Sequence, residues 1–71
     1  MSKTYKPLDQ ILKSSGFRYE AIAENMGITY NALYRIRIAP NKLTVDRIRD
    51  LEKAAGLAEN RIYDLLKNFE N

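Results

Sequence analysis

The stretch YEAIAENMGITYNALYRIR, residues 19–37, decides the fold of this chain. Over residues 19–26, Ile22 and Ala23 lie on the apolar face of a short helix. Gly27 follows at once, at a position where a left-handed turn favours a residue without a Cβ atom. The pattern therefore predicts a helix that stops abruptly at this glycine.

A second helix begins only a few residues after this stop. Thr29 is suited to cap its amino end, and Leu33 and Ile36 lie inward at helical spacing. Two helices joined by so short a turn form a helix-turn-helix, whose axes cross at roughly 90 to 120°. We therefore predict a helix-turn-helix over about residues 19–37, with its second helix over residues 29–37.

Three more helices are expected around this unit, because Pro, Gly and capping residues divide the rest of the chain into short helical segments. The first begins near Pro7 and ends before Gly16, the fourth is capped by Thr44 and ends at Gly56, and the fifth covers about residues 58–68. No alternating run of Val, Ile or Thr is long enough to predict a strand. The expected fold is all-α, with five helices in one compact domain over residues 1–71.

Residue type divides the expected core from the expected surface. Phe17 and Met26 are predicted in the core, and Val45 and the apolar residues that follow it at helical spacing are predicted to face inward. The nine carboxylates mostly alternate with Lys or Arg, so we expect them as solvated surface charge. Residues 1–6 are expected to form a flexible arm.

The composition argues against several kinds of site. The chain has no His and no Cys, which removes the usual zinc ligands, thiol nucleophiles and near-neutral general bases. We therefore expect neither catalysis nor a metal or other cofactor, and a chain of 71 residues leaves no room for a separate ligand-sensing domain. No stretch approaches the roughly 20 apolar residues that span a bilayer, so no membrane partner and a cytoplasmic location are expected.

Positive charge gathers in two parts of the chain, whose overall net charge is +3. Residues 1–18 hold four Lys or Arg against one Asp, and residues 29–53 hold six against three acidic residues. The outward face of the second predicted helix falls in the latter part, and it carries Tyr30, Asn31, Tyr34 and Arg35. Amide, guanidinium and hydroxyl groups bond base edges or phosphates in the major groove of DNA. The alternative is a protein-interaction module, because Tyr and Arg are also enriched at protein interface hot spots.

At these positions the sequence resembles the Cro and phage-repressor-like helix-turn-helix family, also called the XRE family. The run FRYEAIAENMGIT, residues 17–29, is similar to the family pattern LSQEELAEKLGVS, with Ala23 and Gly27 in register. The run LTVDRIRDLEKAAGL, residues 43–57, is similar to the family's fourth helix. The resemblance covers about residues 8–66. It implies a lambda-repressor-like fold and sequence-specific binding of double-stranded DNA by a transcriptional regulator of prokaryotic or phage type.

The resemblance also implies which residues contact DNA. It assigns base reading to Tyr30, Asn31 and Arg35, with Tyr34 beside them, and a phosphate contact to Tyr19. Arg37 stands where the family frequently has Glu and is expected to add a phosphate contact. The full expected set is Tyr19, Thr29, Tyr30, Asn31, Tyr34, Arg35, Arg37 and Lys42. Near the carboxyl end, Leu66 and Phe69 are expected either to cover the base of the first helix or to pack against a second copy of the chain in a homodimer.

Overall fold

The structure, a computed structural model, describes residues 3–67, and within them lie five α-helices and one 3-10 turn. Their order is α1 (Lys6–Ser14), α2 (Tyr19–Met26), α3 (Tyr30–Ile38), the 3-10 turn η1 (Pro40–Lys42), α4 (Val45–Ala54) and α5 (Arg61–Leu66). No strand occurs within the described residues. The prediction of an all-α fold with five helices is confirmed.

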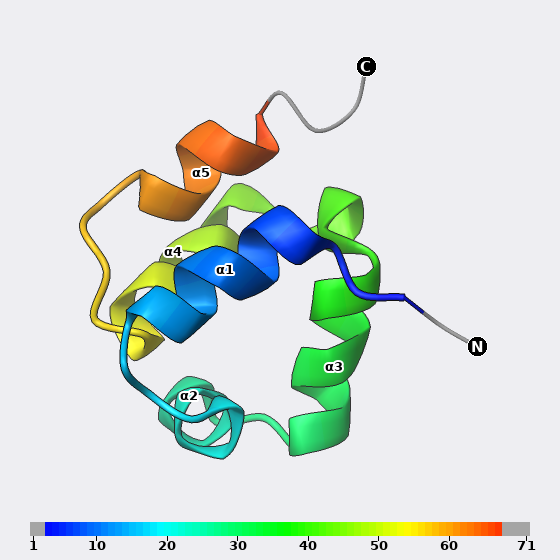
Figure 1. Cartoon of the computed structure of the whole chain (residues 1–71), viewed down its shortest axis with the longest axis vertical. Helices are drawn as coiled ribbons and strands as arrows, with labels where there is room; N and C mark the ends of the chain where they lie inside the picture. Colours follow the sequence, from blue (N-terminus) through cyan, green and yellow to red (C-terminus); the bar gives the residue numbers. More distant parts are fainter. Residues whose placement is uncertain (1–2, 68–71) are drawn as a thin grey trace.

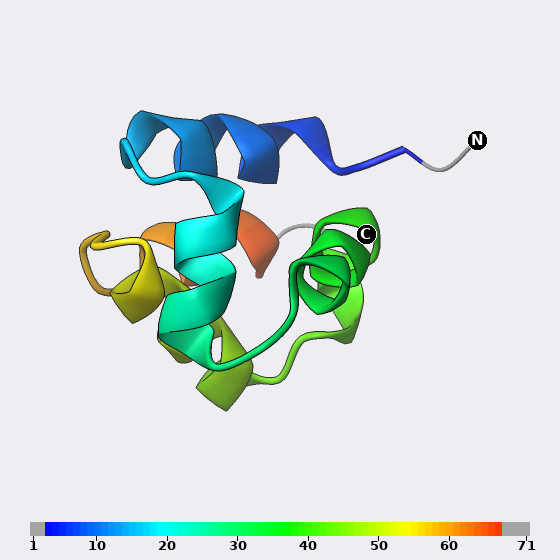
Figure 2. The ribbon, with the colours of Figure 1, turned by 90° about the horizontal axis from the view of Figure 1, so that it is seen from below.

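The helices surround one apolar core (Figure 1). In this view, α1 passes in front of α4, α5 lies above these two helices, and α3 forms the right-hand edge of the molecule. In the perpendicular view, α1 lies across one side of the bundle (Figure 2). Every helix contributes at least one fully buried side chain: Leu8 and Leu12 from α1, Ile22 from α2, Leu33 from α3, Leu51 from α4 and Ile62 from α5.

The connection between α2 and α3 is short: α2 ends at a residue in the left-handed conformation, and α3 begins directly afterwards with a side-chain cap. Gly27 has a φ of 75°, and the N–H of Ile28 donates to the carbonyl oxygen of Ala23 at 3.0 Å, which closes the end of α2. The Oγ1 atom of Thr29 then accepts from the N–H of Ala32 at 3.0 Å. The predicted bounds of α2, the stop at the glycine and the threonine cap are all confirmed.

Gly27→Val is expected to destabilise the protein through backbone strain alone, since no heavy atom lies within 4 Å of a Cβ added there. The left-handed region costs a non-glycine residue roughly 1–2 kcal/mol, and a β-branched residue fits it worst. Gly27→Asn is the control, because Asn tolerates this region better. Urea unfolding measures both, and a valine variant with the wild-type midpoint would contradict the left-handed turn.

The last helix starts later than predicted, at Arg61 rather than near residue 58. Asn60 precedes it with a φ of 72° and is the one non-glycine residue with positive φ among residues 3–67. Residues 58–60 therefore form a turn, closed by a hydrogen bond from the N–H of Arg61 to the carbonyl oxygen of Ala58. The predicted end of this helix, at residue 68, lies outside the described residues.

Glu52 explains this late start. It was expected on the surface with the other carboxylates, but only 2% of it is exposed. Its Oε1 atom accepts from the N–H of Asn60 at 3.1 Å, and its Oε2 atom accepts from the N–H groups of Ile62 and Tyr63, both at 2.9 Å. N–H groups in the first turn of a helix have no partner within the helix. A carboxylate of α4 therefore caps the amino end of α5.

Two apolar residues that were predicted to lie inside are exposed, Phe17 at 45% and Val45 at 48%. Phe17 lies between α1 and α2, outside either helical repeat, and its ring covers the turn at Gly56, where an added Cβ would lie 3.1 Å from the ring. Val45 is the first residue of α4. Met26, at the end of α2, is half-buried against the core.

Candidate nucleic-acid interface

α3 turns one side to the core and the other to solvent. Leu33 is fully buried, whereas Tyr30, Asn31 and Arg35 are exposed, as their spacing predicts. Tyr34 is half-buried beside them. The outward face of α3 thus offers an amide, a guanidinium and two phenol rings within two helical turns.

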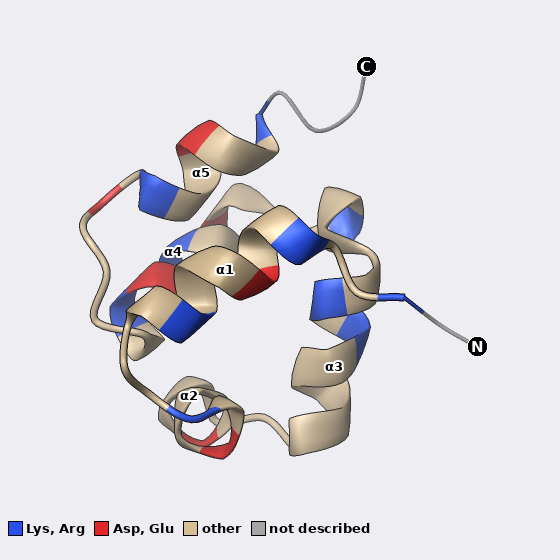
Figure 3. Cartoon of the chain, viewed as in Figure 1, with Lys and Arg blue, Asp and Glu red and all other residues tan. Residues whose placement is uncertain are grey.

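Positive charge borders this face on the side of α4. A groove of about 290 Å³ separates α3 from the start of α4, and Arg35, Lys42 and Arg47 are among its lining residues. None of these three cations forms an ion pair with any residue from 3 to 67. In Figure 3, positive segments cover the carboxyl half of α3, whereas its amino half carries no charge. Unpaired cations along a groove are suited to anionic groups.

Arg37 is buried rather than outward, and only 9% of it is exposed. Its Nε atom donates to Oδ1 of Asp9 on α1 at 2.8 Å, and its guanidinium carbon lies 3.8 Å from the ring centre of Tyr19. The expected placement of Arg37 on the outward side of α3 is therefore wrong. Arg37 lies four residues after Leu33, one helical turn along the same inward stripe.

The ion pair between Asp9 and Arg37 keeps both groups charged. Burial by itself raises the pKa of Asp9, but hydrogen bonds from Arg37 and Thr4 and the positive charge of Arg37 outweigh it, so that this pKa lies below its usual value. Burial likewise lowers the pKa of Arg37, and the bond to Asp9 reverses that effect and raises it. The expectation that carboxylates lie on the solvated surface is wrong for Asp9 as well as for Glu52.

The lowered pKa of Asp9 predicts a loss of stability in acid. Because the pKa is lower in the folded state than the unfolded value of about 3.9, this contribution is fully present above that pH and is lost as the pH falls through the folded pKa. Asp9→Asn removes the titration, so thermal unfolding should depend less on pH below about pH 4 in this variant than in wild type. Asp46→Asn, at an exposed position, is the control. Equal pH dependence in wild type and Asp9→Asn would contradict the ion pair.

Tyr19, at the start of α2, packs its ring against the guanidinium of Arg37. Its hydroxyl oxygen is buried, and burial raises the pKa of this phenol. A covered hydroxyl cannot reach a phosphate outside the protein, so the expected phosphate contact of Tyr19 is wrong. The tyrosine ring instead contacts the guanidinium of Arg37, an arrangement in which the positive charge is stabilised by the ring face.

The amino-terminal segment lies against α3 instead of extending freely from Thr4 onward. The N–H of Tyr5 donates to the carbonyl oxygen of Arg37 at 2.8 Å, and the hydroxyl of Thr4 donates to Asp9. α1 then begins at Lys6. The prediction of a flexible arm over residues 1–6 is therefore corrected, since residues 4–6 belong to the folded domain.

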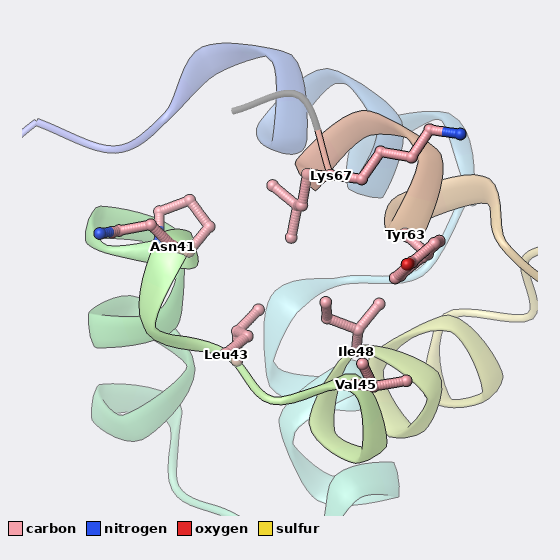
Figure 4. Close-up of a pocket in the computed structure, with 8 residues that line it drawn as sticks. Asn41, Leu43, Val45, Ile48, Tyr63 and Lys67 are labelled. Atoms are coloured by element: carbon pink, nitrogen blue, oxygen red, sulfur yellow. The ribbon is translucent and has the colours of Figure 1, made fainter. Parts of the chain in front are cut away.

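A second hollow of about 290 Å³ lies on another part of the surface, between η1, α4 and α5 (Figure 4). Leu43 and Ile48 point into it, whereas Asn41 and Lys67 direct their polar ends away. Leu66 lines this hollow but belongs to the core of its own chain, with 9% of it exposed, which leaves little of it for a second copy. Phe69, the other residue expected at a dimer interface, lies outside the described residues.

Comparison with known proteins does not identify a function for this chain, so the function is argued from the geometry of the α3 surface. No family model matches the sequence, and no curated protein or solved structure is significantly similar to it. The resemblance to the Cro and phage-repressor-like family rests on its quoted residues and stays a prediction. Within the described part of the chain, no helix has the length and apolar character needed to cross a membrane.

Proposed function

We propose that this protein binds double-stranded DNA in a sequence-specific manner through α3, as a cytoplasmic transcriptional regulator of prokaryotic or phage type. The observation that carries the proposal is the exposed face of α3, which pairs the amide of Asn31 with the guanidinium of Arg35 next to unpaired cations. The tight connection at residues 27–29 supports a helix-turn-helix of the lambda-repressor-like kind. Catalysis forms no part of this function.

Base reading falls to two side chains one helical turn apart. Asn31 bonds N6 and N7 of adenine, and Arg35 bonds O6 and N7 of guanine. Tyr30 and Tyr34 flank them and contact sugars, phosphates or thymine methyl groups. Lys42, beyond the end of α3, meets a phosphate together with Arg47 at the start of α4, which sets the position of the helix on the duplex.

The alternative function is docking of the same face on a partner protein, and the 46% exposure of Tyr30 favours it. Salt separates the two functions. DNA binding driven by phosphate contacts weakens steeply between about 50 and 200 mM salt, because each contact releases counterions. A protein contact anchored by a tyrosine ring changes little over that range.

The decisive experiment is selection of the purified protein on a random DNA library, followed by sequencing of the retained duplexes. Asn31→Ala and Arg35→Ala are each expected to relax one position of the selected motif, by about 1–3 kcal/mol of discrimination. Arg49→Ala is the matched control, since Arg49 is an exposed arginine of α4 that pairs with Glu59 at 2.6 Å. It should leave the motif unchanged. A motif that both α3 variants leave unaltered at every position would move the reading function away from α3 and favour protein docking.

A further inference from the structure

A third hollow, a groove of about 410 Å³ distinct from the two described above, runs between the amino-terminal segment and the carboxyl half of α3. The hydrogen bond between Tyr5 and the carbonyl of Arg37 holds the segment there. In Figure 3 the positive amino-terminal segment and the positive part of α3 lie on the same side of the molecule. The lining residues are Lys3, Thr4, Lys6, Tyr34 and Arg37.

The groove carries an excess of positive charge. Lys3 and Lys6 are exposed, and neither forms an ion pair within residues 3–67. Asp9 bonds the groove residues Thr4 and Arg37, and its charge is matched by that of Arg37. The two lysines therefore remain as uncompensated cations beside a polar wall.

Arg37 is held in place before any ligand arrives. Its Nε and Nη2 atoms lie 2.8 and 3.5 Å from the two carboxylate oxygens of Asp9, and Tyr19 covers one face of the guanidinium. A guanidinium has five N–H donors, and two of them point to Asp9. Because the group is buried and fixed, it loses little side-chain entropy when it binds an oxyanion.

We propose that this groove is an oxyanion site that takes one phosphate group, and that the phosphate belongs to the DNA backbone beside the base pairs contacted by α3. The assignment to DNA rests on the proposed function. Tyr34 lines the groove and is the chain neighbour of Arg35, so a duplex read by Arg35 brings its backbone to this side of α3. The phosphate contact would fix the register of α3, since phosphate contacts position a protein on the duplex without reading sequence.

The DNA arm of the test compares two double variants of equal charge. Lys3→Ser/Lys6→Ser removes the lysines of the groove, and Lys13→Ser/Lys53→Ser removes two exposed lysines from the ends of α1 and α4. Fluorescence anisotropy on the selected duplex and on a scrambled duplex gives affinity between 50 and 200 mM KCl. The groove variant should bind both duplexes more weakly and lower the salt slope by about one unit more than the control, as expected for one phosphate.

The second arm uses inorganic phosphate and needs no DNA. NMR spectra of the wild-type protein are recorded while phosphate replaces chloride at constant ionic strength. Saturable shifts of the Lys6 and Tyr34 amides and of the Arg37 Nε–H are expected, and they should be absent from Lys3→Ser/Lys6→Ser. The Lys13→Ser/Lys53→Ser protein should respond as wild type does.

The two arms separate the failure of this site from the failure of the proposed function. If the protein binds DNA, but the groove variant behaves as the control and phosphate shifts nothing, the site is overturned and DNA binding stands. If phosphate shifts the groove but the groove variant binds DNA as the control does, the DNA assignment is overturned and the ligand is a free phosphate. Shifts without any DNA binding overturn the proposed function and leave the oxyanion site. If the protein shows neither DNA binding nor phosphate-induced shifts, both the oxyanion site and the proposed function are overturned.

Discussion

Glu52→Ala is expected to lower the free energy of unfolding by about 3–5 kcal/mol, because it leaves three backbone N–H groups at the start of α5 without their acceptor. A domain of 71 residues has a total stability of about 4–10 kcal/mol, so the loss is a large share of it. Urea unfolding followed by far-UV circular dichroism measures the change. α5 should show the earliest loss of amide protection in hydrogen exchange.

Two variants frame this result. Glu52→Gln keeps one acceptor oxygen in a side chain of nearly the same shape and should lose about half as much stability. Glu59→Ala removes an exposed carboxylate from the same connection and should change stability little, since surface ion pairs contribute little. If Glu52→Ala and Glu59→Ala unfold at the same urea concentration, Glu52 does not cap α5.

Leu33→Ala should cost about 2–5 kcal/mol, because Leu33 is fully buried and its truncation leaves a cavity where α3 meets the core. Under the proposed function, the same variant should also weaken DNA binding, since the outward face of α3 is held in position by this contact. Thermal unfolding and anisotropy on the selected duplex measure the two effects.

Val45→Ala is the contrasting variant, because sequence spacing predicts Val45 in the core and the structure exposes it. Its stability should stay within about 1 kcal/mol of wild type. A loss as large as that of Leu33→Ala would return Val45 to the core and overturn the observed start of α4.

Local chemistry explains why parts of the fold could be predicted well. The caps at Thr29 and Thr44 and the stop at Gly27 involve partners within three to five residues along the chain, so the signals lie side by side in the sequence. The exposed placement of Asn31 and Arg35 follows in the same way from the helical repeat of Leu33. The start of α5 escaped prediction because its cap comes from α4, and a carboxylate eight or more residues away is not a local signal.

The sequence by itself determined that the chain is all-α, where α2 ends, and that Tyr30, Asn31 and Arg35 face outward on α3, because each depends on periodicity and on neighbours in the chain. Only the tertiary structure decided which charged residues near the α3 surface are buried and which partners they have. The helical stripe of Leu33 already puts Arg37 inward, but a charged side chain stays buried only with a partner. That partner, Asp9, is 28 residues away and meets Arg37 only when the helices assemble around the common core. The same assembly covers the hydroxyl of Tyr19 and places the amino-terminal lysines beside α3, since contacts between distant segments exist only once the helices have assembled.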